Sequence, residues 1–166
     1  MDLAALNRAE RERATADLLA CCGSRGWAES MADRRPFAGV EDLLQSAGDE
    51  WWVRDETDWL EAFAAHPRIG EHRGGDDRHS SWSRSEQSGM EAADTAVTAA
   101  IADCNRRYEE RFGYRFLVCA TGLGAAELLD ACRRRLENDP DEELLVAAAE
   151  QEKITELRLR KLLGVD

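Results

Sequence analysis

The stretch MEAADTAVTAAIADCNRRYEERFG, residues 90–113, decides the fold class of this chain. Its apolar residues recur every three or four positions, at Met90, Ala93, Val97, Ile101, Cys104 and Tyr108. This spacing places them on one face of an α-helix, and we expect the helix to close near Gly113. We therefore predict a long helix at the centre of a helical core.

Most of the remaining chain also carries the spacing or the boundary signals of helices. We predict helices at residues 7–22, 27–31, 40–47, 55–66, 125–138 and 140–163. Asn7 and Glu10 form the capping-box pattern that would open the first of these, and Gly23 would close it.

One short run does not fit a helix. Phe116-Leu117-Val118-Cys119-Ala120 is continuously apolar and bounded by glycines, which predicts a buried extended segment. A lone segment of this kind cannot satisfy its own backbone, so its N–H and C=O groups are available to a buried polar ligand. The predicted fold class is all-α, a single-domain helical bundle over residues 1–166 with an extended segment near 116–120.

Composition limits the classes of partner. The chain has 166 residues, a formal charge of -12 and a pI near 4.8, which argues against nucleic acid and against an anionic membrane surface. No run approaches the roughly 20 apolar residues of a membrane span, and the N-terminus lacks the pattern of a secretory signal. We expect a cytoplasmic protein.

The cysteines are five in number and include no C-x-x-C pair. An odd count without that spacing argues against a disulfide scaffold and against a cysteine zinc site. We predict reduced thiols packed in the core.

The motif Ala65-His66-Pro67-Arg68-Ile69-Gly70 contains the best candidate for a reactive residue. Pro67 disfavours helical geometry at His66, so the imidazole should project from the end of a helix. Histidine can take or give a proton near neutral pH, and the negative end of the helix dipole favours its protonated form. The alternative is a helix-terminal histidine that only caps carbonyl groups.

Two further patterns point to ligand binding. Ser83-Arg84-Ser85-Glu86-Gln87 is a capping box, and the same helix start could also present N–H groups, a carboxylate and an amide to an anionic ligand. Arg158 lies four residues from both Ile154 and Leu162, inside an apolar stripe. A buried guanidinium needs an anion, either a substrate carboxylate or an internal acidic side chain.

A metal site is not expected. His72 and His79 lie in the glycine- and aspartate-rich segment 71–81, but metal-binding spacings such as H-E-x-x-H are absent from the sequence.

Taken together, these residues resemble the 2-oxo-4-hydroxy-4-carboxy-5-ureidoimidazoline (OHCU) decarboxylases of urate breakdown. The resemblance rests on six motifs in order: Cys21-Cys22-Gly23-Ser24 before Trp27, Arg35-Pro36-Phe37, His66 to Gly70, Ser83-x-x-Glu86-Gln87-x-Gly89, Phe112 to Ala120, and Lys153-Ile154-x-x-Leu157-Arg158-Leu159. It implies an all-helical homodimer without cofactor or metal.

The resemblance also implies roles for individual residues. His66 and Glu86 match catalytic positions. The substrate-holding positions are Pro67, Ser83, Gln87, the main chain of Phe116, Leu117, Val118, Cys119 and Ala120, and Arg158. The implied reaction converts OHCU into (S)-allantoin and carbon dioxide. The alternatives are a non-catalytic helical module that binds a ligand or partner, and a hydrolase of a related ureido compound.

Overall fold

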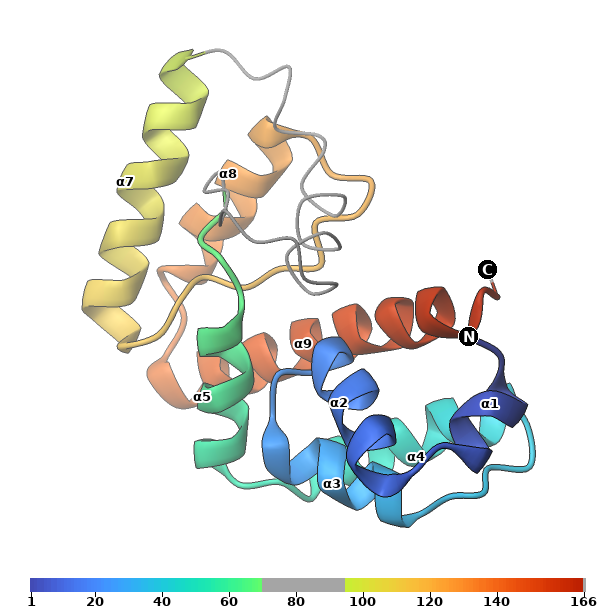
Figure 1. The fold of residues 1–166 in the computed structure, drawn as a ribbon. Helices are drawn as coiled ribbons and strands as arrows, with labels where there is room; N and C mark the ends of the chain where they lie inside the picture. Colours follow the sequence, from blue (N-terminus) through green and yellow to red (C-terminus); the bar gives the residue numbers. More distant parts are fainter. Residues whose placement is uncertain (70–94, 166) are drawn as a thin grey trace. The chain divides into compact units, whose positions relative to one another are not determined.

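The computed structural model describes residues 1–69 and 95–165, and these residues form eight α-helices without a β-strand (Figure 1). The all-α prediction is therefore confirmed. The helices are α1 (Leu3–Arg8), α2 (Arg11–Cys21), α3 (Arg25–Asp33), α4 (Val40–Trp52), α5 (Glu56–Ala65), α7 (Thr95–Phe112), α8 (Ala125–Arg135) and α9 (Pro140–Leu163).

The helices group into two compact units. The first unit comprises Met1–Ala62 and Glu152–Asp166, and the second comprises Phe63–Gln151. Helix α9 contributes its N-terminal half to the second unit and its C-terminal half to the first. The single domain over residues 1–166 stays a prediction.

The first unit is built by α2 packing on α3 and α3 packing on α4. Its interior holds large side chains that are fully buried, among them Leu18, Trp27 and Leu43. Ser24 begins α3, because its hydroxyl oxygen accepts the Trp27 N–H at 3.2 Å and its hydroxyl donates to Asp58 at 3.0 Å. The cysteine–glycine–serine motif thus has a structural role in placing α3.

The start of the chain corrects one prediction. Asn7 does not open a helix: it lies inside α1, and its side chain pairs with the main chain of Phe37 through two hydrogen bonds of 2.9 Å. Helix α2 begins separately at Arg11, and its N-cap residue Glu10 makes no side-chain cap. The Asn7 amide satisfies a distant loop instead of the local backbone, so the capping-box prediction is wrong.

The second unit is built around α7 and α8, which pack against each other. Ile101, Cys104 and Tyr108 of the predicted α7 face are buried in its core, whereas Met90 and Ala93 lie outside the described residues. Residues 115–120 are neither helix nor strand, which agrees with the prediction of a non-helical run.

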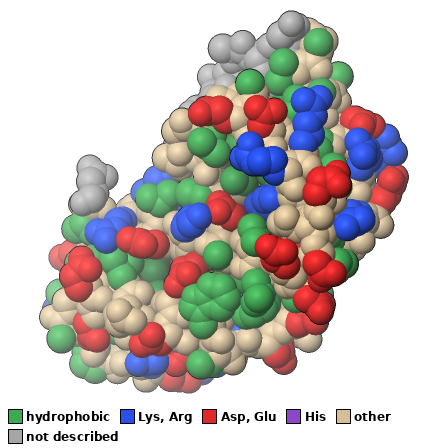
Figure 2. Space-filling model, turned by 180° about the vertical axis from the view of Figure 1, so that it is seen from behind, with side chains coloured by type: hydrophobic (Ala, Val, Ile, Leu, Met, Phe, Trp, Pro, Cys, Tyr) green, Lys and Arg blue, Asp and Glu red, His purple; other side chains and the backbone are tan. Residues whose placement is uncertain are grey.

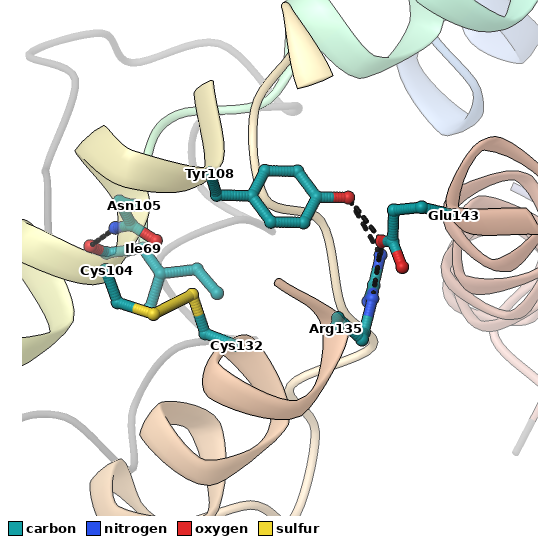
Figure 3. The surroundings of a disulfide bond; sticks show 7 residues. All are labelled: Ile69, Cys104, Asn105, Tyr108, Cys132, Arg135 and Glu143. Carbon is teal, nitrogen blue, oxygen red and sulfur yellow. Dashed lines mark hydrogen bonds and ion pairs between the residues drawn. A yellow bond between two sulfur atoms is a disulfide. The ribbon is translucent and has the colours of Figure 1, made fainter. Parts of the chain in front are cut away.

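A disulfide in the second unit corrects a second prediction. Cys104 of α7 and Cys132 of α8 form a disulfide bond inside the core (Figure 3), so these two residues are not the reduced thiols that we expected. Their positions are 28 residues apart, and only the packing of the two helices brings them together. Cys21, Cys22 and Cys119 lie outside this bond.

Beyond the start of α2, three helices differ from their predicted bounds by more than one residue. Helix α3 spans Arg25–Asp33 rather than residues 27–31. Helix α4 continues to Trp52 rather than ending near Ala47, since Trp51 is buried and extends its apolar face. Helix α8 ends at Arg135, three residues early, whereas α9 has the predicted bounds.

Within residues 1–69 and 95–165, the helices lack the combination of length and apolar character needed to cross a bilayer. On the face shown in Figure 2, acidic and basic side chains are interspersed.

Candidate functional site

His66 follows the last helical residue of α5, as the proline after it predicts. Its backbone N–H donates to the Phe63 carbonyl at 3.2 Å, and the residue is only 6% exposed. The imidazole Nε2 lies 2.9 Å from Oε1 of Gln151, a fully buried residue of α9. The ring is therefore held within the second unit by a side chain from another helix.

The carbonyl groups at the end of α5 are bound by Arg115. Its guanidinium donates to the Ala64 carbonyl at 3.1 Å and to the His66 carbonyl. An arginine from the irregular segment thus caps this helix end, while the His66 ring points to Gln151. This arrangement disfavours the view that His66 serves only as a cap.

The segment 116–120 has backbone groups bound by side chains, as expected for an isolated run. The Leu117 carbonyl accepts from Nη1 of Arg135 at 2.6 Å. The Cys119 N–H donates to Oε2 of Glu150 at 2.7 Å. Phe116, Leu117 and Ala120 are buried, whereas Val118 and Cys119 are half-buried, so part of the segment remains accessible for ligand contact.

A buried polar network contacts this segment through Arg135. Oε1 of Glu143 accepts from Nε of Arg135 at 2.7 Å and from the Tyr108 hydroxyl (Figure 3). Its Oε2 accepts from Asn138 at 2.8 Å. Burial raises the pKa of Tyr108, against the opposing effect of the Arg135 charge. Arg135 therefore links the Leu117 carbonyl to a buried carboxylate.

Arg158 belongs to the first unit and is fully buried, as its place in the apolar stripe predicts. Its positive charge acts on the Cys22 thiol. Burial raises the pKa of Cys22 to about 12, against the opposing effects of a hydrogen bond with Thr155 and of the Arg158 charge. A cationic group is thus held in a desolvated environment, where an anion binds strongly.

Other predicted residues lie outside the described part of the chain. These are Ser83, Glu86 and Gln87, together with His72 and His79. Pro67 is described and buried beside His66. In the described ranges, no three side chains of the metal-ligating types gather in one place.

Sequence reasoning missed three residues that hold the site: Arg115, Glu150 and Gln151. Gln151 had a signal, because it stands seven residues before Arg158 and so shares its buried stripe. Arg115 and Glu150 had none, since their partners are main-chain groups brought near by the fold.

The chain is similar to known proteins over most of its length. A family model described as OHCU decarboxylase matches residues 7–160. The uric acid degradation bifunctional protein TTL of Arabidopsis thaliana is 40% identical over 147 residues, which are 86% of this chain and 45% of that protein. The chain thus spans less than half of that relative.

Two further similar proteins match this chain over most of its length and most of their own. The 2-oxo-4-hydroxy-4-carboxy-5-ureidoimidazoline decarboxylase of Mus musculus is 30% identical over 149 residues, 82% of this chain and 78% of that protein. A crystal structure of OHCU decarboxylase in the presence of (S)-allantoin matches with a TM-score of 0.79 and 38% identity, covering 94% of this chain and 99% of that one.

Proposed function

The chain belongs to the OHCU decarboxylase family, carboxy-lyases of urate degradation, and we propose that it converts OHCU into (S)-allantoin and carbon dioxide with His66 as the proton-transfer residue. The main support for this proposal is the position of His66. The residue is buried at a helix end, where Arg115 donates a hydrogen bond to its carbonyl and Gln151 contacts its imidazole. A histidine held in one orientation suits proton transfer, because an imidazole can both take and give a proton.

The chemistry needs a place for one electron pair. When the bond to the carboxylate breaks, its pair forms a carbon–carbon double bond toward the carbon that bears the ureido group. The carbon–nitrogen π pair of the ring moves onto nitrogen, which takes a proton. The substrate thus supplies its own electron sink, so the proposed reaction requires no pyridoxal or thiamine.

Proton movement completes the reaction. In our proposal His66 takes the proton of the substrate hydroxyl, so that a carbonyl group forms there. The double-bond pair then accepts a proton at the ureido-bearing carbon, and delivery to one face gives (S)-allantoin. The protein contributes position, charge and proton transfer.

Substrate binding is assigned to three groups. Arg158 would bind the carboxylate, because a buried guanidinium and a carboxylate form a strong bidentate pair. Main-chain groups of Phe116 to Ala120 and the ring of Pro67 would contact the substrate ring. Resemblance alone assigns a catalytic role to the Glu86 carboxylate. It likewise assigns substrate-binding roles to Ser83 and Gln87.

Assembly and location are further parts of the proposal. Family resemblance supports a homodimer, and composition supports a cytoplasmic protein. Light scattering coupled to gel filtration would measure the oligomer, and a monomeric mass at working concentration would contradict the dimer.

The test generates OHCU from urate with urate oxidase and hydroxyisourate hydrolase, adds the protein, and follows the circular dichroism of (S)-allantoin. We expect rapid appearance of the chiral product with the wild-type protein. His66→Asn should abolish it, with unchanged helical content. The matched control is His79→Asn, since the proposal gives His79 no role.

Either of two results would overturn the assignment. Full activity in a folded His66→Asn protein would remove His66 from the mechanism. Tight binding of (S)-allantoin together with only slow racemic product would instead favour the non-catalytic binding module.

A further inference from the structure

We infer that Gln151 is a positioning residue that fixes the tautomer of His66, with the proton on Nε2 and the lone pair on Nδ1. This inference rests on the proposed function, because it names the nitrogen that would take the substrate proton. It concerns two residues of the second unit, His66 after α5 and Gln151 in α9.

The contact itself defines the direction of the hydrogen bond. Oε1 of Gln151 lies 2.9 Å from Nε2 of His66, and an amide oxygen can only accept. In this orientation of the amide, Nε2 is the donor and carries the proton. A neutral imidazole has one protonated nitrogen, so its lone pair lies on Nδ1, which becomes the basic atom.

The surroundings keep this arrangement rigid. Gln151 is fully buried and sits on a long helix, and His66 is 6% exposed. Arg115 holds the backbone of the histidine through its carbonyl group. The residue before Gln151, Glu150, binds the Cys119 N–H at 2.7 Å. One turn of α9 therefore positions both the candidate base and the candidate substrate-binding segment.

A neutral partner also suits the charge of a general base. When Nδ1 takes a proton, the Nε2–H bond to the amide oxygen becomes charge-assisted and stronger, which stabilises the imidazolium as it forms. A carboxylate in the same place would stabilise the imidazolium even before reaction. His66 would then be protonated near neutral pH and unable to accept a proton.

Two near-isosteric variants separate this role from a merely structural one. Gln151→Glu should raise the pKa of His66 and move the acidic limb of the kcat/KM profile up by about one pH unit or more. Gln151→Met removes the acceptor and should move the same limb down by roughly half a unit to one unit. Gln45→Glu and Gln45→Met, on the exposed surface of α4, are matched controls that should leave the profile unchanged.

The other charged groups around this pair are the same in every variant. Among residues 1–69 and 95–165, hydrogen bonds and ion pairs place three such groups here: Arg115 on the His66 carbonyl, the Arg68–Glu109 ion pair that follows His66, and Glu150 beside Gln151. Opposite shifts in the two Gln151 variants would therefore come from position 151. Loss of activity in both variants without any shift of the limb would show that Gln151 only supports packing, and would overturn the inference.

The tautomer is measured directly by long-range proton–nitrogen NMR of the histidine rings, with His66 assigned from its absence in His66→Asn. We expect the neutral ring of His66 to be protonated on Nε2 in the wild type, with a larger Nδ1–H population in Gln151→Met. A wild-type ring protonated on Nδ1 would overturn the inference. This readout needs no turnover, so it decides the role of Gln151 even if the proposed reaction fails.

Discussion

Arg135→Met removes the guanidinium that neutralises Glu143 in the interior of the second unit. The wild-type side chain donates to Glu143 at 2.7 Å and to the Leu117 carbonyl at 2.6 Å. Methionine keeps much of the apolar stem that carries the guanidinium to 4.8 Å from the Phe116 ring centroid. The substitution therefore tests the charge and the hydrogen bonds more than the packing.

Burial decides the magnitude. The Arg135 and Glu143 side chains are 11% and 0% exposed. Removing one partner of a buried pair leaves an uncompensated charge and costs about 3 to 5 kcal/mol. The Arg106–Glu110 pair is 62% and 63% exposed, and pairs of that kind contribute less than about 1 kcal/mol. A loss of 3 to 5 kcal/mol is a large part of the roughly 5 to 15 kcal/mol that stabilises a domain.

The assay is urea unfolding followed by far-ultraviolet circular dichroism. Arg134→Met, on the exposed side of the same helix, is the matched control and should change the free energy of unfolding by less than about 0.5 kcal/mol. The double variant Arg135→Met/Glu143→Leu removes both charges and should recover part of the lost stability, although it leaves the Tyr108 and Asn138 donors without Glu143. Equal effects of Arg135→Met and Arg134→Met would refute the reasoning, as would a double variant no more stable than the single one.

Three further predictions concern the second unit. Burial raises the folded-state pKa of Tyr108. The contribution of the neutral phenol to stability is therefore complete below the unfolded pKa of about 10 and is lost as the pH rises above it. Tyr108→Phe should flatten the alkaline fall in the thermal midpoint, and an unchanged slope would contradict this. Alkylation in denaturant without reductant should label three of the five cysteines, and reducing the disulfide across its 28-residue separation should cost roughly 3.5 kcal/mol of stability; labelling of all five would contradict the disulfide. Glu150→Ala removes the acceptor of the Cys119 N–H and should raise KM about tenfold, which corresponds to a loss of about 1.4 kcal/mol. Glu150→Gln retains an acceptor and should keep KM close to the wild-type value. Equal KM values in the two variants would show that this hydrogen bond does not serve substrate binding.

The accurate predictions came from local signals. The periodic faces of α7 and α9 follow from side-chain spacing along one helix, and the end of α5 follows from the steric effect of Pro67 on the residue before it. Each of these signals acts within one or two helical turns, so it can be seen in the sequence without knowledge of the fold.

Two of the errors came from partners that are distant in the sequence. Asn7 looks like a helix cap, but its amide has two better-placed partners on the Phe37 backbone. Cys104 and Cys132 carry no pairing signal, because only the contact between α7 and α8 brings them together. A local motif offers one use for a polar group, and tertiary structure can supply a competing one.

The buried face of α9 shows that the sequence argument used for Arg158 could have identified further residues of the candidate site. Glu143, Gln151 and Arg158 interrupt an apolar face at intervals of about two helical turns, and all three are fully buried. Apolar residues there would pack without the cost of burying polar groups, so each polar residue requires a partner that offsets its desolvation. Glu143 meets Arg135 and Tyr108, and Gln151 meets His66, which ties the interruptions to the elements that carry the candidate base and the binding segment. The same reasoning that selects Arg158 from the sequence therefore selects Glu143 and Gln151, because a polar residue in a buried stripe requires a specific partner.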